Sequence, residues 1–316
     1  MVTLSCVVPA TNRPATLERA LAAIRAAVDP PEELIVIEEP SLAGPAEARN
    51  DGARRATGDV LVFVDSDVVV HEDAFQRLRA AFAADPDLVA VFGSYDEEVA
   101  TSGVVAGFRN LLHHHVHQKS GGDAQTFWAG LGAVRRDAFL AADGFDADRY
   151  PVPSIEDIEL GGRLAAAGSR ILLDPALQGT HLKEWQLSDM IKTDFAPRGV
   201  PWVELPLERR NLPTALNLGW HERTSAAAAL VAAISLLRRK PAGAVIALGS
   251  LVALNRDFYE LLARRQGSHR AAIGVGLHAI HHLTAAAAIP TGVVAHLRRR
   301  RISSRTGGTS DRSPVT

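Results

Sequence analysis

The sequence predicts an α/β protein whose first part is an open, mostly parallel sheet with helices on both faces. Short apolar runs alternate with helical patterns from Thr3 to Phe92, which is the order of elements in such a sheet. The runs are apolar at successive positions, as in strands buried on both faces. With 316 residues, of which 47% are hydrophobic, the chain is long enough to bury a full core.

Four runs are predicted to be strands: residues 4–8, 34–37, 60–64 and 88–92. The first connecting helix is predicted from Leu17, Leu21, Ile24 and Val28, which recur at helical spacing after Asn12 and Pro14, residues suited to open a helix. Two further helices are predicted, over Pro45–Ala56 and over Glu72–Ala84, the latter with Phe75, Leu78 and Phe82 on one face.

Residues 93–220 are more irregular and should form the second half of the same domain, against the half at 1–92. Two short helices, Arg136–Ala142 and Glu156–Ala167, and a strand at 170–173 are predicted there. Because open parallel sheets bind ligands at the carboxyl ends of their strands, this half should supply the other wall of a cleft.

Residues 221–301 form an Ala-rich, apolar helical region that we expect to associate with a membrane. The segments 224–237 and 242–255 are shorter than the roughly 20 residues of an upright span. The basic residues at 238–240 between them would also oppose the positive-inside tendency, so re-entrant or interfacial helices are favoured. Basic residues flank 271–297 on both sides, which favours a shallow hairpin broken near Pro290 or a helix lying in the interface.

A soluble helical bundle or a dimer face is the alternative for this region, so a homo-oligomer stays open. The tail at 302–316 has the composition of a disordered end.

Composition excludes some classes of protein. With 34 basic and 36 acidic residues the net charge is −2, which argues against a nucleic-acid partner. The single cysteine, Cys6, excludes an internal disulfide framework and indicates a reducing compartment. The first residues lack the pattern of a secretory signal.

Two carboxylates, Asp65 and Asp67, directly follow the apolar run at 60–64. Burying an unpaired carboxylate is costly, so these side chains must leave the core, pair with a cation group or hold a metal ion. Mg²⁺ and Mn²⁺ prefer carboxylate oxygens and often share them with substrate phosphates. The alternative is a loop whose acids cap the next helix.

Five segments resemble, in order, the landmarks of inverting family 2 glycosyltransferases of the GT-A fold. They are "CVVPATNRPATLERAL", "ELIVIEEPS", "ARNDGARRATGDVLVFVDSD", "AGLGAVRRDAFLAADGFD" and "SIEDIELGGRLAAAG". Further segments, "NLLHHHVHQ", "TFWAG", "THLKEW" and "RGVPW", resemble a membrane-associated bacterial branch of that family.

The resemblance implies that Asp65 and Asp67 hold the diphosphate and ribose of a nucleotide-sugar donor through Mg²⁺ or Mn²⁺, with Asp67 the more direct ligand. The metal would offset charge that grows on the leaving diphosphate. His181 in "THLKEW" is a further candidate ligand, with a structural histidine bonded to backbone as the alternative.

Other donor contacts are also implied by the resemblance. Glu39 occupies the position that reads the nucleotide base, where the family usually has aspartate, and this departure leaves the base open. The backbone near Pro9 and Ala10 and the side chain of Arg49 match further donor contacts. For Arg49 the alternative is an ion pair on a helix surface.

"SIEDIEL" contains the second pair of carboxylates. An inverting transfer needs a base that deprotonates the acceptor hydroxyl. The resemblance assigns that role to Asp157, with Glu156 as its neighbour or as an acceptor ligand. Helix capping, in which Ser154 and these acids favour the helix N-terminus, is compatible with the same residues.

The histidine cluster at 113–117 is less informative. His113 and His117 would share a helix face at i and i+4, but no acidic partner stands at metal-ligand spacing. We expect a solvated or membrane-interface helix near the acceptor entrance.

The predicted function is therefore a metal-dependent inverting glycosyltransferase at the cytoplasmic face of the cell membrane, acting on a lipid-linked or other membrane-proximal glycan acceptor. A noncatalytic subunit that binds sugar nucleotides or glycans is the alternative, disfavoured because it needs no base. A nucleotidyltransferase would need a Gly-rich phosphate loop that "PATNRP" does not provide.

Overall fold

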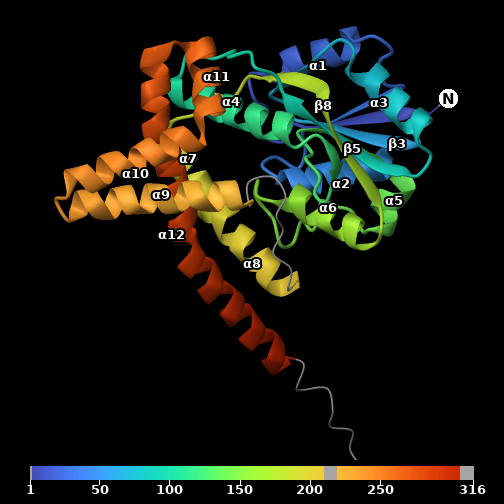
Figure 1. Ribbon diagram of the computed structural model, residues 1–316. Helices are drawn as coiled ribbons and strands as arrows, with labels where there is room; N and C mark the ends of the chain where they lie inside the picture. Colours follow the sequence, from blue (N-terminus) through green and yellow to red (C-terminus); the bar gives the residue numbers. More distant parts are fainter. Residues whose placement is uncertain (1, 210–218, 307–316) are drawn as a thin grey trace, which may run out of the picture.

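The computed structural model describes residues 2–209 and 219–306 (Figure 1). Its centre is an eight-stranded sheet in the order β2-β1-β3-β7-β5-β8-β4, with β6 paired to β8. The strands are β1 (Leu4–Pro9), β2 (Glu33–Ile37), β3 (Val60–Val64), β4 (Val68–Val70), β5 (Leu88–Tyr95), β6 (Gly122–Ala124), β7 (Leu131–Arg135) and β8 (Arg170–His181). All four predicted strands are present, and the predicted strand at 170–173 is the first third of β8.

The α/β prediction is confirmed, but the sheet is mixed and not mostly parallel. Strands β2, β1 and β3 are parallel, as are β5 and β8. Strand β7 runs antiparallel between β3 and β5, and β4 and β6 pair antiparallel with β8. The direction of β7 depends on a long-range pairing, which the local apolar pattern does not encode.

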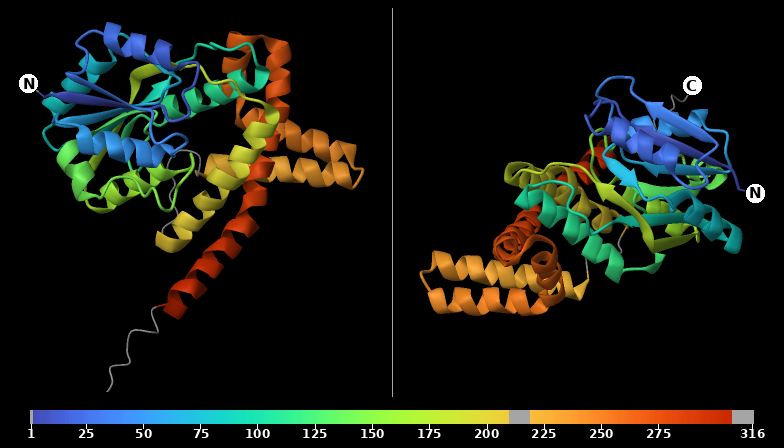
Figure 2. Two further views of the ribbon diagram at one scale, coloured as in Figure 1. Left: turned by 180° about the vertical axis from the view of Figure 1, so that it is seen from behind. Right: turned by 90° about the horizontal axis from the view of Figure 1, so that it is seen from above.

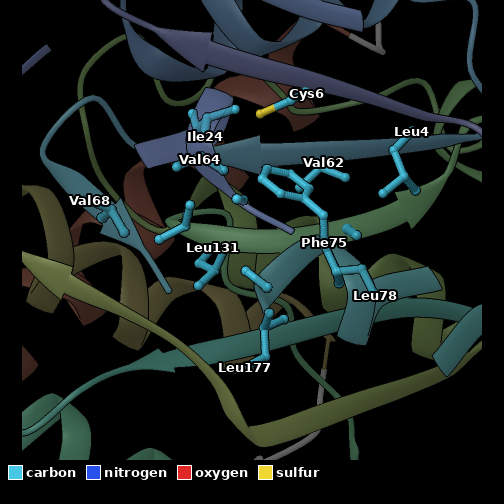
Figure 3. Close-up of a cluster of buried hydrophobic side chains, with 14 of the residues drawn as sticks. Leu4, Cys6, Ile24, Val62, Val64, Val68, Phe75, Leu78, Leu131 and Leu177 are labelled. Atoms are coloured by element: carbon cyan, nitrogen blue, oxygen red, sulfur yellow. The ribbon is translucent and has the colours of Figure 1, made fainter. Parts of the chain in front are cut away.

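Helices cover both faces of the sheet and bury two hydrophobic cores. On one face α1 (Leu17–Ala26) and α3 (Ala74–Ala84) pack on the sheet through Ile24, Phe75 and Leu78, around buried strand residues such as Cys6 (Figure 3). On the other face lie α2 (Pro45–Arg55), α5 (Arg136–Ala141) and α6 (Glu156–Ala166), with Phe139 and Leu160 among their buried residues. Val28, predicted on the stripe of the first helix, lies beyond the end of α1 and is 50% exposed.

Helix α4 (Val104–Lys119) corrects the expectation of a solvated or interfacial helix at the histidine cluster. It lies between the sheet and the C-terminal helices, and it contacts β5, α11 and α12 (Figure 1). His117 is 5% exposed and its Nδ1 is 2.8 Å from the Gly93 carbonyl oxygen. The prediction failed because the histidines suggested an exposed helix, although one face of this helix is buried.

The C-terminal part consists, in its described residues, of helices joined by short turns. It consists of α7 (Leu187–Thr193), a short π-helix η1 (Asp194–Gly199), α8 (Val200–Arg209), α9 (Trp220–Leu237), α10 (Pro241–Leu254), α11 (Arg256–Gln266) and α12 (Ser268–Thr306). Helix α12 passes through Pro290 without interruption, so the expected break there is wrong. It also continues to Thr306, which removes 302–306 from the predicted disordered tail; the rest of that tail lies outside the described residues.

Candidate active site

The D-S-D segment forms the turn between β3 and β4 at the carboxyl edge of the sheet. The Asp65 N–H donates to the Gly130 carbonyl at 3.0 Å, and the Val68 N–H donates to the Asp65 carbonyl at 3.0 Å. This turn takes both carboxylates out of the apolar run, and their side chains remain 31% and 23% exposed for Asp65 and Asp67 respectively. The pair leaves the core, as its cost of burial requires.

Arg49 links the two predicted pairs of carboxylates. Its guanidinium donates to Asp65 Oδ1 at 2.6 Å and to Glu156 Oε1 at 2.9 Å, and the residue is only 4% exposed. Burial, together with the charge of Asp67, raises the pKa of Asp65, although Arg49 opposes this. Arg49 on α2 is therefore a buried bridge between distant parts of the chain, and not an ion pair on a helix surface.

Glu156 and Asp157 begin α6 and differ in their surroundings. Glu156 is 4% exposed and is held by Arg49 and by the Ser154 N–H, which donates to Oε2 at 2.9 Å. Asp157 is half-buried and accepts the N–H groups of Ala129 at 3.1 Å and Ile158 at 2.8 Å. Burial and the adjacent charge of Glu156 raise the pKa of Asp157 to about 6.

His181 faces Asp67 across the β4–β8 pairing, with Nε2 3.5 Å from Asp67 Oδ2. Its Nδ1 lies 2.6 Å from Asn110 Oδ1, and the Asn110 amide donates back to the His181 carbonyl at 3.4 Å. Because the amide nitrogen is used in that bond, Oδ1 is the acceptor and Nδ1 carries the proton. In the neutral ring the lone pair of Nε2 therefore points toward Asp67. Burial alone would raise the pKa of Asp67, but a protonated His181 ring lowers it, because Nε2–H then donates to the carboxylate and the ring carries a positive charge.

Tyr95 and Asn110 were missed by the sequence analysis. Tyr95 ends β5 and its ring stacks on His181 at 4.2 Å with an interplanar angle of 7°. The centroid of the His113 ring also lies 4.2 Å from that of Tyr95. Burial lowers the pKa of His113. Asn110 is the first residue of "NLLHHHVHQ", but the interpretation of that segment considered only the histidines after it.

The remaining candidates lie at the same edge, where β1 and β2 end side by side. Glu39 is exposed, with Oε1 3.0 Å from Arg13 and Oε2 accepting the Ser41 N–H at 2.8 Å. Pro9 ends β1, and the Ala10 N–H is already donated to the Ile37 carbonyl at 2.8 Å. The Ala10 amide is therefore not a free donor for a nucleotide.

A separate cavity of about 750 Å³ lies between α6, β6 and α8, lined among others by Thr126, Gly162 and Trp202. None of the predicted site residues lines it. The carboxylates at the sheet edge thus lie outside this cavity.

Comparison with known proteins finds a family match for part of the chain. Residues 30–141 match the family "Glycosyl transferase family 2". Two curated proteins from strains of Mycobacterium tuberculosis, each named pre-mycofactocin glycosyltransferase, are 29% identical over 167 residues, which is 50% of this chain and 34% of theirs. The chain thus spans about a third of the length of the curated relatives it matches.

A mannosyltransferase from Pyrobaculum calidifontis, solved with GDP-Man and Mn²⁺, has a similar fold. Its TM-score is 0.55 at 16% identity, over 91% of this chain and 87% of that one. The match at 30–141 includes the D-S-D turn. Residues 30–141 are therefore similar to glycosyltransferase family 2, and the chain shares the GT-A fold of that mannosyltransferase.

Proposed function

We propose that the protein is an inverting glycosyltransferase that moves a sugar from a nucleotide-diphosphate donor to a lipid-linked or other membrane-proximal glycan acceptor. The observation that carries the proposal is the meeting of two carboxylate pairs, Asp65 with Asp67 and Glu156 with Asp157, through Arg49 at one sheet edge. One pair suits the donor diphosphate and the other provides a base.

The donor atoms fit a divalent cation that is shared with a diphosphate. Asp67 offers a carboxylate and His181 offers Nε2, which in the neutral ring has a free lone pair, whereas Asp65 is engaged by Arg49. Within residues 2–209 and 219–306 no group of three or more His, Cys, Asp or Glu side chains could hold a metal ion alone. Mg²⁺ or Mn²⁺ would take its other ligands from phosphate oxygens and water, and when bound would stabilise the leaving diphosphate.

Asp157 is the proposed catalytic base. Two backbone N–H groups fix the orientation of its carboxylate, and each oxygen keeps a lone pair for a proton. The acceptor oxygen forms a bond to the anomeric carbon while its proton passes to Asp157. The bond from the anomeric carbon to the phosphate oxygen breaks with its electron pair, and the nucleoside diphosphate leaves from the opposite face.

Arg49 and Glu156 hold this arrangement in place. Arg49 balances the charge of Asp65 and Glu156, and Glu156 in turn raises the pKa of Asp157. Asp157 is then a stronger base than an ordinary carboxylate, yet it stays mostly ionised at neutral pH. Glu39, Pro9 and Ala10 remain proposed contacts for the nucleoside, with the side chain of Glu39 the more available group.

The membrane location is supported by the apolar C-terminal region at 221–301, which we propose as a unit appended to the transferase domain at 1–220. Among the described helices, Ser268–Arg300 of α12 is long and apolar enough to cross a membrane. We place the enzyme at the cytoplasmic face, where nucleotide sugars and a free thiol such as Cys6 are both expected.

Calorimetry with UDP, GDP, dTDP and CDP, each with and without Mn²⁺, tests the donor site. We expect one nucleotide to bind only with metal, and Asp67→Ala to abolish that binding. Asp73→Ala, in an exposed ion pair with Arg77, serves as the matched control and should bind normally.

Transfer tests the base. Asp157→Asn should keep metal-dependent nucleotide binding and lose at least about a hundredfold in transfer rate. If transfer survives in Asp157→Asn, the assignment of the base is wrong. If the wild type binds a nucleotide but transfers nothing to any lipid-linked acceptor, a binding subunit is the better description.

A further inference from the structure

Helices α9 and α10 form an antiparallel hairpin that projects from the rest of the molecule (Figures 1 and 2). The turn between them consists of Arg238, Arg239 and Lys240. Its base is fixed by Asn255, whose amide donates to Ser225 Oγ at 2.9 Å. The hairpin is an ordered part of the fold whose long sides are not covered by the α/β domain.

Small residues form the buried side of this hairpin. Ala229 and Ala232 of α9 and Ala244 and Ala247 of α10 are each no more than 6% exposed. Leu251, near the base, is the large residue among them. Seams of small residues allow close helix approach and are typical of helix pairs in membranes.

Large apolar residues point outward instead. Leu237 is 84% exposed, Ile246 71% and Val245 69%. Other large apolar side chains exposed on the same two helices are Leu230, Val231, Ile234, Leu236, Val252 and Leu254. A hairpin in water would bury such residues and expose the alanines, so the observed arrangement is the reverse of that expected in water.

The distribution of these exposed apolar residues favours lipid, and not a protein partner, as the material that covers the hairpin. The exposed apolar side chains lie on the outward sides of both helices, whereas a docked protein would cover one side. An interfacial helix would also need a polar face, which neither helix has. Helix α9 has 18 residues, of which the first four are polar or aromatic, and α10 has 14, about 21 Å, so the apolar part of the hairpin fits within the hydrocarbon layer without crossing it upright.

Charge points to anionic lipid. No aspartate or glutamate occurs between Glu222 and Asp257, whereas the turn carries three consecutive cations. Basic residues beside apolar segments bind anionic headgroups. We propose that the α9–α10 hairpin inserts at a tilt into the hydrocarbon of one leaflet of a bilayer, with its basic turn at the anionic headgroups of the same face. This inference rests on the membrane location in the proposed function and adds the element responsible for it.

Vesicle flotation of the full chain tests the proposal. Protein purified in mild detergent is diluted into vesicles of phosphatidylcholine with or without phosphatidylglycerol. We expect Val245→Asp/Ile246→Asp to lower the partition coefficient at least about tenfold, because acidic side chains are strongly disfavoured in hydrocarbon. Leu140→Asp, which changes a 44% exposed leucine on α5, is the matched control and should partition normally.

A second variant, Arg238→Gln/Arg239→Gln/Lys240→Gln, should remove most of the preference for phosphatidylglycerol, about tenfold or more. Equal loss of partitioning in Leu140→Asp and in the hairpin variant would overturn the proposal. So would unchanged partitioning of the hairpin variant with a changed oligomeric state in sedimentation, because a second copy would then be the occupant.

Depth of insertion gives an independent measurement. Cys6 is fully buried, so a fluorescent NBD label at Ile246→Cys reports on the hairpin alone. We expect a blue shift on vesicles and quenching by spin-labelled acyl chains, with neither at Leu140→Cys. The donor site is tested separately, because the nucleotide calorimetry needs no vesicles. Intact metal-dependent nucleotide binding without insertion of the hairpin would refute this inference and leave the proposed donor site standing.

Discussion

Asp157 shows how one carboxylate acquires a pKa suited to base catalysis. Its pKa of about 6 has two causes that raise it, burial and the charge of Glu156, and these exceed the opposing effects of Arg49 and two backbone N–H groups. The base must be ionised to accept a proton. We therefore expect kcat/KM to fall about tenfold per pH unit below about pH 6.

The variant Glu156→Gln tests the cause of this fall in kcat/KM at low pH, the acid limb of the pH profile. Glutamine still accepts the hydrogen bond of Arg49 but has no charge, so the pKa of Asp157 should fall and the acid limb should move to lower pH. Initial rates between pH 4.5 and 8 measure the shift. A limb that stays in place would mean that another group controls it.

Asn110 also acts at the scale of single residues, because its side-chain oxygen accepts the Nδ1 proton of His181. Replacing it with leucine removes the acceptor of the Nδ1 proton, so the ring is no longer held with Nε2 toward Asp67. We expect Mn²⁺ affinity in the presence of the bound nucleotide to fall roughly tenfold to a hundredfold.

Calorimetric titration of Mn²⁺ into Asn110→Leu measures this change. Gln118→Leu, on the same helix but exposed, is the control. The nitrogen NMR shifts of His181 in the metal-free protein should report a loss of the single tautomer. An unchanged tautomer together with unchanged affinity would refute the role of Asn110.

At the scale of elements, helix α6 is placed by a glycine. A Cβ at Gly161 would lie 2.2 Å from the Phe127 backbone nitrogen, so α6 lies directly against the segment before β7. Gly161→Ala must push apart the helix that carries Asp157 and the loop whose Ala129 N–H orients it. We expect a loss of about 1–3 kcal/mol in unfolding free energy, with lower transfer activity.

Denaturant unfolding measures the loss. Gly249→Ala is the control, since nothing lies within 4 Å of a Cβ there and alanine is the better helix former. Equal stabilities of Gly161→Ala and the wild type would show that the contact is looser than observed.

At the scale of the whole molecule, Asp194 joins the α/β domain to the C-terminal helices. Arg109 on α4 donates to both of its oxygens, at 2.8 and 3.0 Å, and His281 Nδ1 on α12 lies 2.7 Å from Oδ2. Burial would raise the pKa of Asp194, but His281 and Arg109 lower it. A carboxylate with a lowered pKa stabilises the fold above its unfolded pKa, and that stability is lost as pH falls through its folded pKa.

Asp194→Asn should cost about 3–5 kcal/mol near neutral pH, because Arg109 loses a buried partner. The deficit relative to wild type should shrink as pH falls below 3.8, the ordinary pKa of aspartate, and through the lower folded pKa, where the native carboxylate also becomes protonated. Thermal unfolding over a pH series from 7 down to about 2 compares the two proteins, with Asp189→Asn on α7 as an exposed control. A deficit that does not depend on pH would assign the loss to packing.

The sequence by itself determined the local features of this protein. Strand runs, the first helices and the D-S-D and E-D pairs follow from hydrophobic periodicity and from the cost of burying charge, both of which act over a few residues. Resemblance to a family added roles to Glu39, Asp67 and Asp157.

Tertiary structure alone decided which distant residues meet. The antiparallel β7, the bridge of Arg49 between Asp65 and Glu156, and the support of His181 by Asn110 all join positions far apart in the chain. The burial of α4 and the reversed faces of the α9–α10 hairpin likewise depend on which surfaces each helix meets. Such pairings depend on the free energy of the whole packed chain, which no local pattern contains.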